Sequence, residues 1–407
     1  MAGFVIVGAG ECGARAAFAL REKGFDGTIT LIGNETHPPY ERPPLSKEVM
    51  LSGAGPKLVA AVERYAEARI DLLLGRTALE IDRAGKCVLL ADGTAIPYDR
   101  LLLATGARPR PLPGVVHGGR VVTLRTHDDA MHIREYLAKG KHVAILGGGF
   151  IGLELAASAR ALGAAVTLME GQLRVLTRGV PAEIAGVVAA RHAAEGVKIV
   201  CGAKITGVAQ SPDEVRVTLE DGRSVAAELL VVGVGAAPNV ELAQAAGLSV
   251  ENGVATDDFL RSSDLDIFAA GDCACCPSPL YGGHRVRLES WRNAQEQGQR
   301  AAAAMLGETG VHSAVPWFWS DQYDMTMQIA GIADGAMTTV RRDMGEGAFI
   351  LFHLDAEGRL IAASGIGPGN AIARDIRLAE MLIAARSRPD PAALASPETK
   401  LRKLLAA

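Results

Sequence analysis

Two glycine-rich segments contain the residues whose types and spacing most clearly suggest a chemistry. The first reads GAGECG over residues 8–13 and the second reads GGGFIG over residues 147–152. Both fit G-x-G-x-x-G, whose glycines allow a tight turn, close approach of a pyrophosphate and close packing of helix on strand. The helix N-terminus supplies unpaired N–H groups and a positive dipole end for the phosphates. One such motif is weak evidence for a nucleotide site, but two similar motifs in one chain favour two dinucleotides.

Each motif is followed by an acid at the spacing that a dinucleotide site requires. Glu35 lies 27 residues after Gly8, and Glu170 lies 23 residues after Gly147; an acid that binds a ribose is expected after ~20 residues. A carboxylate favours a 2′-hydroxyl over a 2′-phosphate, so Glu170 favours NAD over NADP, although Arg174 and Arg178 weaken this preference. A chain with two dinucleotides usually passes a hydride between a bound flavin and an exchangeable nicotinamide.

Apolar runs and helical patterns place both motifs in the same local unit of strand, turn, helix and strand. The apolar runs lack the alternation of half-exposed strands, which is typical of buried parallel strands. The first module has predicted strands at 4–7 and 28–32 and a helix at 14–20. The second has predicted strands at 143–146 and 165–169 and a helix at 153–162. The chain therefore contains a duplicated module.

A second repeated pattern predicts where the chain crosses between domains. An Asp-Gly turn, an apolar strand, a glycine and prolines follow one another over 92–114 and again over 221–239. From Trp317 onward the pattern changes to short strands (325–329, 348–353, 360–363) and a helix over about 371–386. We therefore predict an α/β protein with two Rossmann-like domains and a smaller C-terminal α+β domain.

Composition excludes several other functional classes. A net charge of −4 argues against general nucleic-acid binding, and no apolar run has the roughly 18 residues of a membrane span. The N-terminus has no signal-peptide pattern, so we expect a cytoplasmic protein. Six cysteines and nine histidines match no disulfide framework, cluster or metal motif, so no metal site is predicted. Cys273 and Cys276 form a CxxC pair, but we expect them to be buried and passive.

Five motifs together resemble the FAD-dependent ferredoxin reductases of bacterial oxygenase systems, of the putidaredoxin reductase and biphenyl dioxygenase reductase type. They are ERPPLSK (41–47), ATGARPR (104–110), GGGFIGLE (147–154), AAGDC (269–273) and PWFWSDQY (316–323). The resemblance spans nearly the whole chain, and ERPPLSK and PWFWSDQY are its most specific parts. It implies a glutathione-reductase-like layout: an FAD domain at 1–107 and 236–315, an NAD domain at 108–235 and a C-terminal domain at 316–407.

The same resemblance implies roles for individual residues. FAD would be bound by the first glycine motif, the ribose acid and residues spread over the first domain and its connections: Gly8, Gly10, Cys12, Gly13, Glu35, Arg42, Lys47, Ala78, Arg125, Asp272 and Trp291. NAD would be bound by the second module and its flanks: Gly147, Gly149, Ile151, Gly152, Glu170, Arg178 and Gly235. Catalysis would involve Lys47, Glu154 and Trp319.

Some of these roles have plainer alternatives. Lys47 follows the rigid Pro43-Pro44 pair, so its own ammonium could be fixed near the flavin. Alternatively, it could be a solvated loop lysine. The resemblance implies that Glu154 lies beside the nicotinamide and Lys47, or it could be an exposed first-turn acid that complements the helix dipole. Asp272 could bond the ribityl chain or cap a helix. Trp319 could lie on the electron path or be an ordinary core aromatic.

Electrons would leave the flavin singly, because no dithiol is expected to relay them. The implied acceptor is a small acidic [2Fe–2S] ferredoxin, or a rubredoxin. A basic docking face is one interpretation of seven arginines, and dispersed solvated charge is the other: Arg285, Arg287, Arg292, Arg341, Arg342, Arg374 and Arg377. Two further alternatives stay open: an NADH oxidase, peroxidase or disulfide reductase on the same scaffold, and a redox-controlled binding protein similar to apoptosis-inducing factor.

Overall fold

The computed structural model describes residues 3–405, and the chain folds into two compact units. Unit 1 consists of the N-terminal segment up to Glu41, Pro56–Arg108 and Ala237–Ala314. Unit 2 consists of Arg42–Gly55, Pro109–Ala236 and the C-terminal segment from Val315. Two of the passages of the chain between the units lie within the short strands β8 (Ala107–Pro109) and β17 (Ala236–Pro238).

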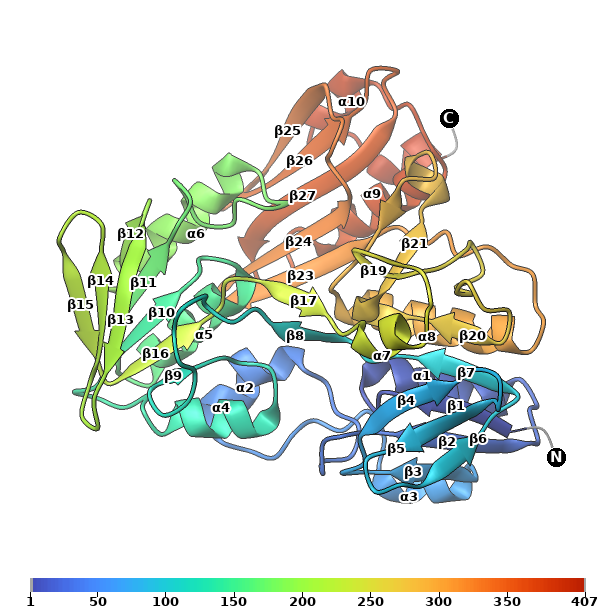
Figure 1. The fold of residues 1–407 in the computed structure, drawn as a ribbon. Helices are drawn as coiled ribbons and strands as arrows, with labels where there is room; N and C mark the ends of the chain where they lie inside the picture. Colours follow the sequence, from blue (N-terminus) through green and yellow to red (C-terminus); the bar gives the residue numbers. More distant parts are fainter. Residues whose placement is uncertain (1–2, 406–407) are drawn as a thin grey trace. The chain divides into compact units, whose positions relative to one another are not determined.

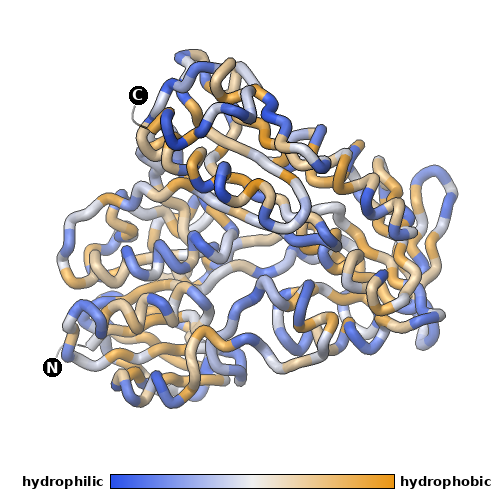
Figure 2. Tube along the Cα trace, turned by 180° about the vertical axis from the view of Figure 1, so that it is seen from behind, coloured by the Kyte–Doolittle hydropathy of each residue, from blue (hydrophilic) through white to orange (hydrophobic). Residues whose placement is uncertain are grey.

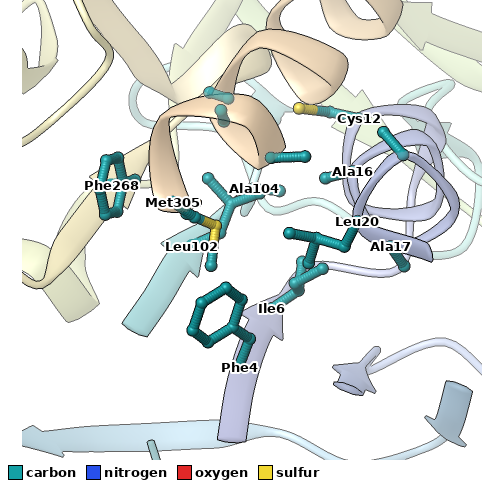
Figure 3. Close-up of a cluster of buried hydrophobic side chains, with 14 of the residues drawn as sticks. Phe4, Ile6, Cys12, Ala16, Ala17, Leu20, Leu102, Ala104, Phe268 and Met305 are labelled. Atoms are coloured by element: carbon teal, nitrogen blue, oxygen red, sulfur yellow. The ribbon is translucent and has the colours of Figure 1, made fainter. Parts of the chain in front are cut away.

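A parallel five-stranded sheet forms the centre of unit 1. Its order is β20 (Ile267–Ala269), β7 (Arg100–Leu103), β1 (Gly3–Val7), β2 (Thr28–Ile32) and β3 (Ile70–Leu73). Helices α1 (Glu11–Glu22) and α8 (Trp291–Met305) contact each other and close one hydrophobic core with this sheet. Figure 3 shows Phe4 and Ile6 of β1 in this core with Leu20 of α1 and Met305 of α8.

Smaller elements complete unit 1. The antiparallel strands β4 (Ala78–Asp82), β5 (Cys87–Leu90) and β6 (Ala95–Pro97) form one sheet. A second sheet has the order β18 (Val250–Glu251), β19 (Gly253–Ala255), β21 (Ala274–Pro277) and β22 (Arg285–Val286). The helices outside the central core are α3 (Val62–Glu67), α7 (Glu241–Ala245), η2 (Gly271–Cys273) and η3 (Pro279–Tyr281).

Unit 2 begins with a second parallel sheet. Its order is β12 (Lys198–Cys201), β11 (Ala165–Glu170), β10 (His142–Leu146), β16 (Leu229–Val232) and β9 (Val121–Val122). Its helices are α4 (His127–Arg134), α5 (Phe150–Ala161) and α6 (Ala182–Ala194), and the segment Arg42–Gly55 adds η1 (Pro43–Ser46) and α2 (Glu48–Ser52). A three-stranded sheet is formed by β13 (Ile205–Gln210), β14 (Val215–Leu219) and β15 (Ser224–Ala227).

The C-terminal part of unit 2 is an antiparallel sheet, orange to red in Figure 1, with helix α9 packed on it. The strand order is β23 (Trp317–Gln322), β24 (Met325–Gly331), β27 (Leu360–Pro368), β26 (Ala348–Leu354) and β25 (Thr338–Gly345). Helices α9 (Ala373–Ala384), α10 (Pro391–Ala395) and η4 (Leu401–Leu405) end the described chain.

These elements confirm the predicted duplicated module and the α+β character of the C-terminal segment. In Figure 2 the strands of the parallel sheets are largely hydrophobic, as expected when both faces of a sheet are covered. The patterns missed β23 and β25. In β25 the inward position is occupied by Arg342, only 3% exposed, so a charged residue interrupts the apolar alternation that marks a strand.

Candidate functional site

The first glycine motif is restricted by neighbouring backbone at two positions and is open at a third. A Cβ on Gly8, whose φ is +118°, would lie 2.1 Å from the carbonyl oxygen of Ala104, and one on Gly13 would lie 1.9 Å from the Gly8 carbonyl oxygen. A Cβ on Gly10 would meet nothing within 4 Å. Gly10 also begins α1 without a side-chain cap. The position that should face a pyrophosphate is therefore open, while the other two glycines are required by the fold.

The second motif repeats this pattern in unit 2. A Cβ on Gly147 or Gly152 would collide with the backbone, at 2.2 Å from the Gly233 oxygen and 2.1 Å from the Gly147 oxygen respectively. A Cβ on Gly149 would again meet nothing within 4 Å, and α5 also begins without a side-chain cap. The exposed side chain of Ile151 lies in the first turn of this helix. Both turns therefore fit an anionic dinucleotide on the same local grounds.

The two predicted ribose acids lie at the ends of the expected strands. Glu35 follows β2, and its carboxylate accepts a hydrogen bond from the Tyr40 hydroxyl at 2.6 Å. Glu170 is the last residue of β11, and its carboxylate accepts the backbone N–H of Gly148 at 2.6 Å and that of Gln172 at 2.8 Å. Glu170 is thus fixed beside the glycine turn that it is expected to serve.

The two arginines near Glu170 have different surroundings. The guanidinium of Arg174 donates to the carbonyls of Val175, Leu176 and Val180, so it braces its own loop. Arg178 is exposed. Of these two cations, Arg174 is the less suited to bind a 2′-phosphate, because both of its terminal guanidinium nitrogens already donate to loop carbonyls.

The other residues predicted to bind FAD or NAD are divided between the two units. In unit 1, Ala78 begins β4, Asp272 lies within η2 and Trp291 begins α8. The position before η2 is Ala270, so the alternative that Asp272 is an N-cap is wrong. In unit 2, a guanidinium nitrogen of Arg42 donates to the Arg125 carbonyl at 2.5 Å, and Gly235 has a φ of +110°. Cys12 is buried in the first turn of α1, and burial raises the pKa of its thiol.

Three segments of unit 2 bring the predicted catalytic residues together. The Nζ atom of Lys47 lies 3.3 Å from a carboxylate oxygen of Glu154 and 5.2 Å from the centre of the Trp319 ring. The indole N–H of Trp319 donates to Asp321 at 3.0 Å, and that carboxylate is 3.9 Å from Lys47. Lys47 therefore lies between two acids and an aromatic face, which suits a fixed cation.

Glu154 is the centre of this cluster. It is only 6% exposed, so the alternative of an exposed first-turn acid is wrong. One carboxylate oxygen accepts the Ser46 hydroxyl at 2.5 Å, and the other accepts the Ser320 hydroxyl at 2.6 Å together with the Lys47 ammonium. A buried carboxylate requires such partners, because an isolated one would be strongly disfavoured. Together, these contacts hold the Glu154 carboxylate and the Lys47 ammonium in fixed positions.

Sequence reasoning missed several residues that build this cluster, namely Ser46, Ser320, Gln322 and His192. Ser320 and Gln322 alternate on one face of β23, where polar residues with exposures of 1% and 4% are unexpected. That pattern could have signalled a buried polar site. His192 lies on α6 and is completely buried, and it continues the i+4 spacing of the buried Ile184 and Val188, a local signal that could have placed it on the buried face of the helix.

The burial predicted for Cys273 and Cys276 is confirmed. All six are free, and Cys273 and Cys276 are buried. Burial raises the pKa of the Cys273 thiol, and burial raises that of Cys276 to about 11. Thiols of this kind are poor nucleophiles and poor redox relays at neutral pH.

The proposed basic docking residues are mostly paired. Arg341 bonds Glu183 and Asp343 in unit 2, and Arg377 bonds Glu380. In unit 1, Arg285, Arg287 and Arg292 form ion pairs with Glu251, Glu289 and Glu296 respectively. The buried Arg342 cannot belong to a surface, and its guanidinium donates to the carbonyls of Leu394, Pro397 and Thr399. The interpretation of all seven arginines as one free basic face is therefore wrong for Arg342.

Two observations on residues 3–405 concern other kinds of site. Within that range, no three His, Cys, Asp or Glu side chains are grouped so that they could hold a metal ion. The helices of the same residues include none with the length and hydrophobicity needed to cross a membrane.

Comparisons with known proteins agree with the two glycine motifs. Residues 3–298 match the family model described as pyridine nucleotide-disulphide oxidoreductase, and residues 317–405 match one described as reductase C-terminal. The chain is 43% identical to the ferredoxin–NAD(+) reductase component of the anthranilate 1,2-dioxygenase system of Burkholderia cepacia, over 99% of both chains. It is 37% identical to putidaredoxin reductase of Pseudomonas putida, over 99% of this chain and 96% of that one.

A solved structure supports the same assignment. The crystal structure of the covalent putidaredoxin reductase–putidaredoxin complex matches with a TM-score of 0.93 and 36% identity, over 100% of this chain and 98% of that one. The family implies binding of a flavin and of NAD(H), and both glycine turns fit such ligands. The chain therefore belongs to the pyridine nucleotide-disulphide oxidoreductase family, and its C-terminal part belongs to the family described as reductase C-terminal.

Proposed function

We propose that this protein is an NADH-dependent ferredoxin reductase. It takes a hydride from NADH onto a bound FAD and passes single electrons to a small acidic [2Fe–2S] ferredoxin that feeds an oxygenase of the P450 or Rieske type. Full-length relatives named as ferredoxin–NAD(+) reductase components support this proposal, as does the match to a putidaredoxin reductase in complex with its ferredoxin. NADH is a soluble cofactor of the cytoplasm, so its use as donor supports a cytoplasmic location.

The observation that carries the proposal is the pair of glycine turns with identical construction. Each has two glycines that the backbone requires and one that leaves open space at an uncapped helix N-terminus. An enzyme that used one dinucleotide would need only one such turn. We propose that residues 1–107 and 236–315 bind FAD, that residues 108–235 bind NADH, and that residues 316–407 serve the acceptor.

We assign the predicted site residues within this division. The first glycine motif with Glu35, Ala78, Asp272 and Trp291 would hold FAD, assisted by Arg42, Lys47 and Arg125. The second motif with Ile151, Glu170, Arg178 and Gly235 would hold NADH. The ordered Glu170 carboxylate supports NADH over NADPH, because it would repel a 2′-phosphate and accept a 2′-hydroxyl.

A bound flavin supplies the chemistry of this reaction: it accepts two electrons as a hydride and releases them one at a time. The task of the chain is to position and to tune. Glu154 holds the Lys47 ammonium in place, and the ammonium stabilises negative charge that develops near it. Trp319 covers that cation with an aromatic face. We propose that these three residues act directly at the site of hydride and electron transfer.

Several rival functions are distinct from this one. A disulfide reductase or a peroxidase needs a reactive thiol, and the buried Cys273 and Cys276 with raised pKa values do not favour it. An NADH oxidase, a rubredoxin reductase or a redox-controlled binding protein would share both nucleotide sites. These rivals differ in the acceptor and in the speed of turnover, so the acceptor is the property to measure.

The test is an acceptor panel with purified FAD-containing protein and NADH. Reduction of cytochrome c is followed with [2Fe–2S] ferredoxins, with a rubredoxin, and with neither. Cytochrome c reduction that depends on a [2Fe–2S] protein supports the proposal. Turnover with oxygen alone would identify an oxidase, and slow turnover with every acceptor would favour a binding role.

A further inference from the structure

A continuous line of buried polar side chains runs from Glu154 to Tyr323 within unit 2. Ser320 Oγ lies 2.6 Å from Glu154 Oε1, and Gln322 Nε2 lies 3.0 Å from Ser320 Oγ. His192 Nε2 lies 2.8 Å from Gln322 Oε1, and the Tyr323 hydroxyl lies 3.2 Å from His192 Nδ1. The line joins α5, β23 and α6, and its four members from Glu154 to His192 are at most 6% exposed.

The chemistry of each group fixes the direction of every hydrogen bond in this line. A carboxylate only accepts, so Ser320 must donate its single proton to Glu154 and can only accept from Gln322. The amide N–H₂ of Gln322 therefore faces Ser320, and its oxygen faces His192. That oxygen needs a donor, so Nε2 of His192 carries the proton and Nδ1 accepts from the Tyr323 hydroxyl.

The surroundings of His192 agree with a neutral ring. Burial lowers the pKa of His192, opposed by its bond to Gln322. The charged groups near it are on its own helix and the adjacent turn: Arg191 pairs with Glu195 and with Asp324. The Arg191 guanidinium also lies 4.8 Å from the centre of the Tyr323 ring. A neutral His192 therefore donates from Nε2 to Gln322 and accepts at Nδ1 from Tyr323.

We propose that Gln322 and His192 are positioning residues for the hydride-transfer site, because they fix the Ser320 hydroxyl toward Glu154 and thereby hold the carboxylate against Lys47. This inference rests on the proposed function for the role of Lys47, but the hydrogen-bond order itself does not. Glu154 has a second anchor in Ser46, whose carbonyl accepts the Ser158 hydroxyl at 2.7 Å. The Ser46 anchor holds one carboxylate oxygen, and the His192–Gln322–Ser320 line holds the oxygen that contacts Lys47.

The sharpest variant is Gln322→Glu. A carboxylate at this position still accepts from His192 but cannot donate to Ser320, so it competes with Glu154 for the Ser320 proton. Gln322→Met removes both functions with a similar side-chain volume and serves as the second variant if the first folds poorly. Ser364→Ala is the matched control, because Ser364 is a buried serine of unit 2 that bonds His353 rather than this line.

The experiment has two parts, both on the full-length FAD-containing protein. In the first, long-range ¹H–¹⁵N NMR of protein labelled with ¹⁵N-histidine, assigned with His192→Gln, should show the Nε2–H tautomer of His192 at neutral pH. In the second, NADH:ferricyanide turnover should show kcat lowered on the order of tenfold in Gln322→Glu and in Ser320→Ala, with KM for NADH changed much less. The variant that combines Gln322→Glu with Ser320→Ala should lose no more kcat than either single variant, because the two residues act in series.

Other results would overturn the inference. His192 could be found charged or with its proton on Nδ1, or the losses in kcat could simply add in the double variant. Each of these results would mean that the residues are ordinary buried side chains without a positioning role. Equal losses in Ser364→Ala would have the same meaning. If the wild-type protein failed to oxidise NADH at all, the proposed function would be wrong. The tautomer of His192 would still test the direction of the hydrogen bonds from His192 to Glu154.

Discussion

The hydroxyl of Ser320 donates to the carboxylate of Glu154 over 2.6 Å, although 166 residues separate the two in the chain. The bond joins the first helix of the second module to the first strand of the C-terminal sheet. With Ser46 and Lys47 it leaves Glu154 as a buried anion with three donors. The C-terminal sheet is therefore part of the construction of the predicted catalytic cluster.

We predict that Gly10→Ala removes FAD without unfolding the protein. Gly10 has φ −96° and ψ −166°, which alanine adopts without strain, and its added Cβ meets no protein atom within 4 Å. The methyl group would instead occupy space needed by the pyrophosphate. FAD affinity should fall on the order of tenfold or more, equivalent to about 1.4 kcal/mol. Flavin content of the purified protein and FAD titration of the apoprotein measure this.

Gly149→Ala is the matched variant in the second module. It should keep the flavin and weaken NADH binding instead, because Gly149 has the same open position. If both variants retained wild-type affinity for both nucleotides, the glycine turns would not be phosphate sites.

We predict that Glu170→Ala raises KM for NADH and narrows the preference for NADH over NADPH. The variant loses a charged acceptor, worth about 1.5–3 kcal/mol, or roughly tenfold to a hundredfold in affinity. It also loses the anchor of the Gly148 and Gln172 N–H groups. Steady-state kinetics with both cofactors measure the ratio. Glu170→Gln, which keeps an acceptor but no charge, separates repulsion of phosphate from loss of the anchor.

Lys47 and Glu154 should be coupled in a double-mutant cycle. Lys47→Met leaves a buried acid without its cation, and we expect a loss of about 1–3 kcal/mol in the free energy of unfolding. The same change in a Glu154→Gln background should cost much less, because no charge remains to be compensated. Urea unfolding of the four proteins gives the coupling energy. Additive losses would mean that the 3.3 Å pair contributes nothing.

The local features of the fold could be predicted from patterns in the sequence, whereas the one tertiary contact that was predicted, between Lys47 and Glu154, came from the resemblance. The glycine turns, the strands beside them and the two acids depend on contacts between neighbouring segments, so their spacing alone predicts them. The Glu154 cluster draws Ser46, Ser320 and His192 from segments far apart in the chain. No local pattern encodes such a meeting, and the resemblance supplied Lys47 and Glu154 without the serines that hold them. The sequence pattern missed strand β25 because the buried Arg342 interrupts its apolar alternation.

Stability should decrease in mild acid because of His353. Burial lowers the pKa of His353 to about 4, whereas in the unfolded chain it titrates near its ordinary ~6.5. The neutral ring therefore stabilises the fold fully above pH ~6.5, and this contribution is lost as the pH falls toward about 4. At ~1.4 kcal/mol per pKa unit, the loss is at most about 3.5 kcal/mol.

The check is urea unfolding of the wild type and of His353→Gln across this pH range. The variant should lose less stability between neutral pH and mild acid than the wild type does. Parallel curves for the two proteins would show that His353 does not titrate as its burial requires.

The most direct test of the whole account is anaerobic stopped-flow mixing of the FAD-containing protein with NADH, followed by an oxidised [2Fe–2S] ferredoxin. We predict that NADH bleaches the flavin absorbance rapidly and NADPH much more slowly, and that the ferredoxin then restores the colour while it is itself reduced. A flavin that stays oxidised in the presence of NADH, or that is reoxidised by oxygen but by no iron–sulfur protein, would contradict the central claim.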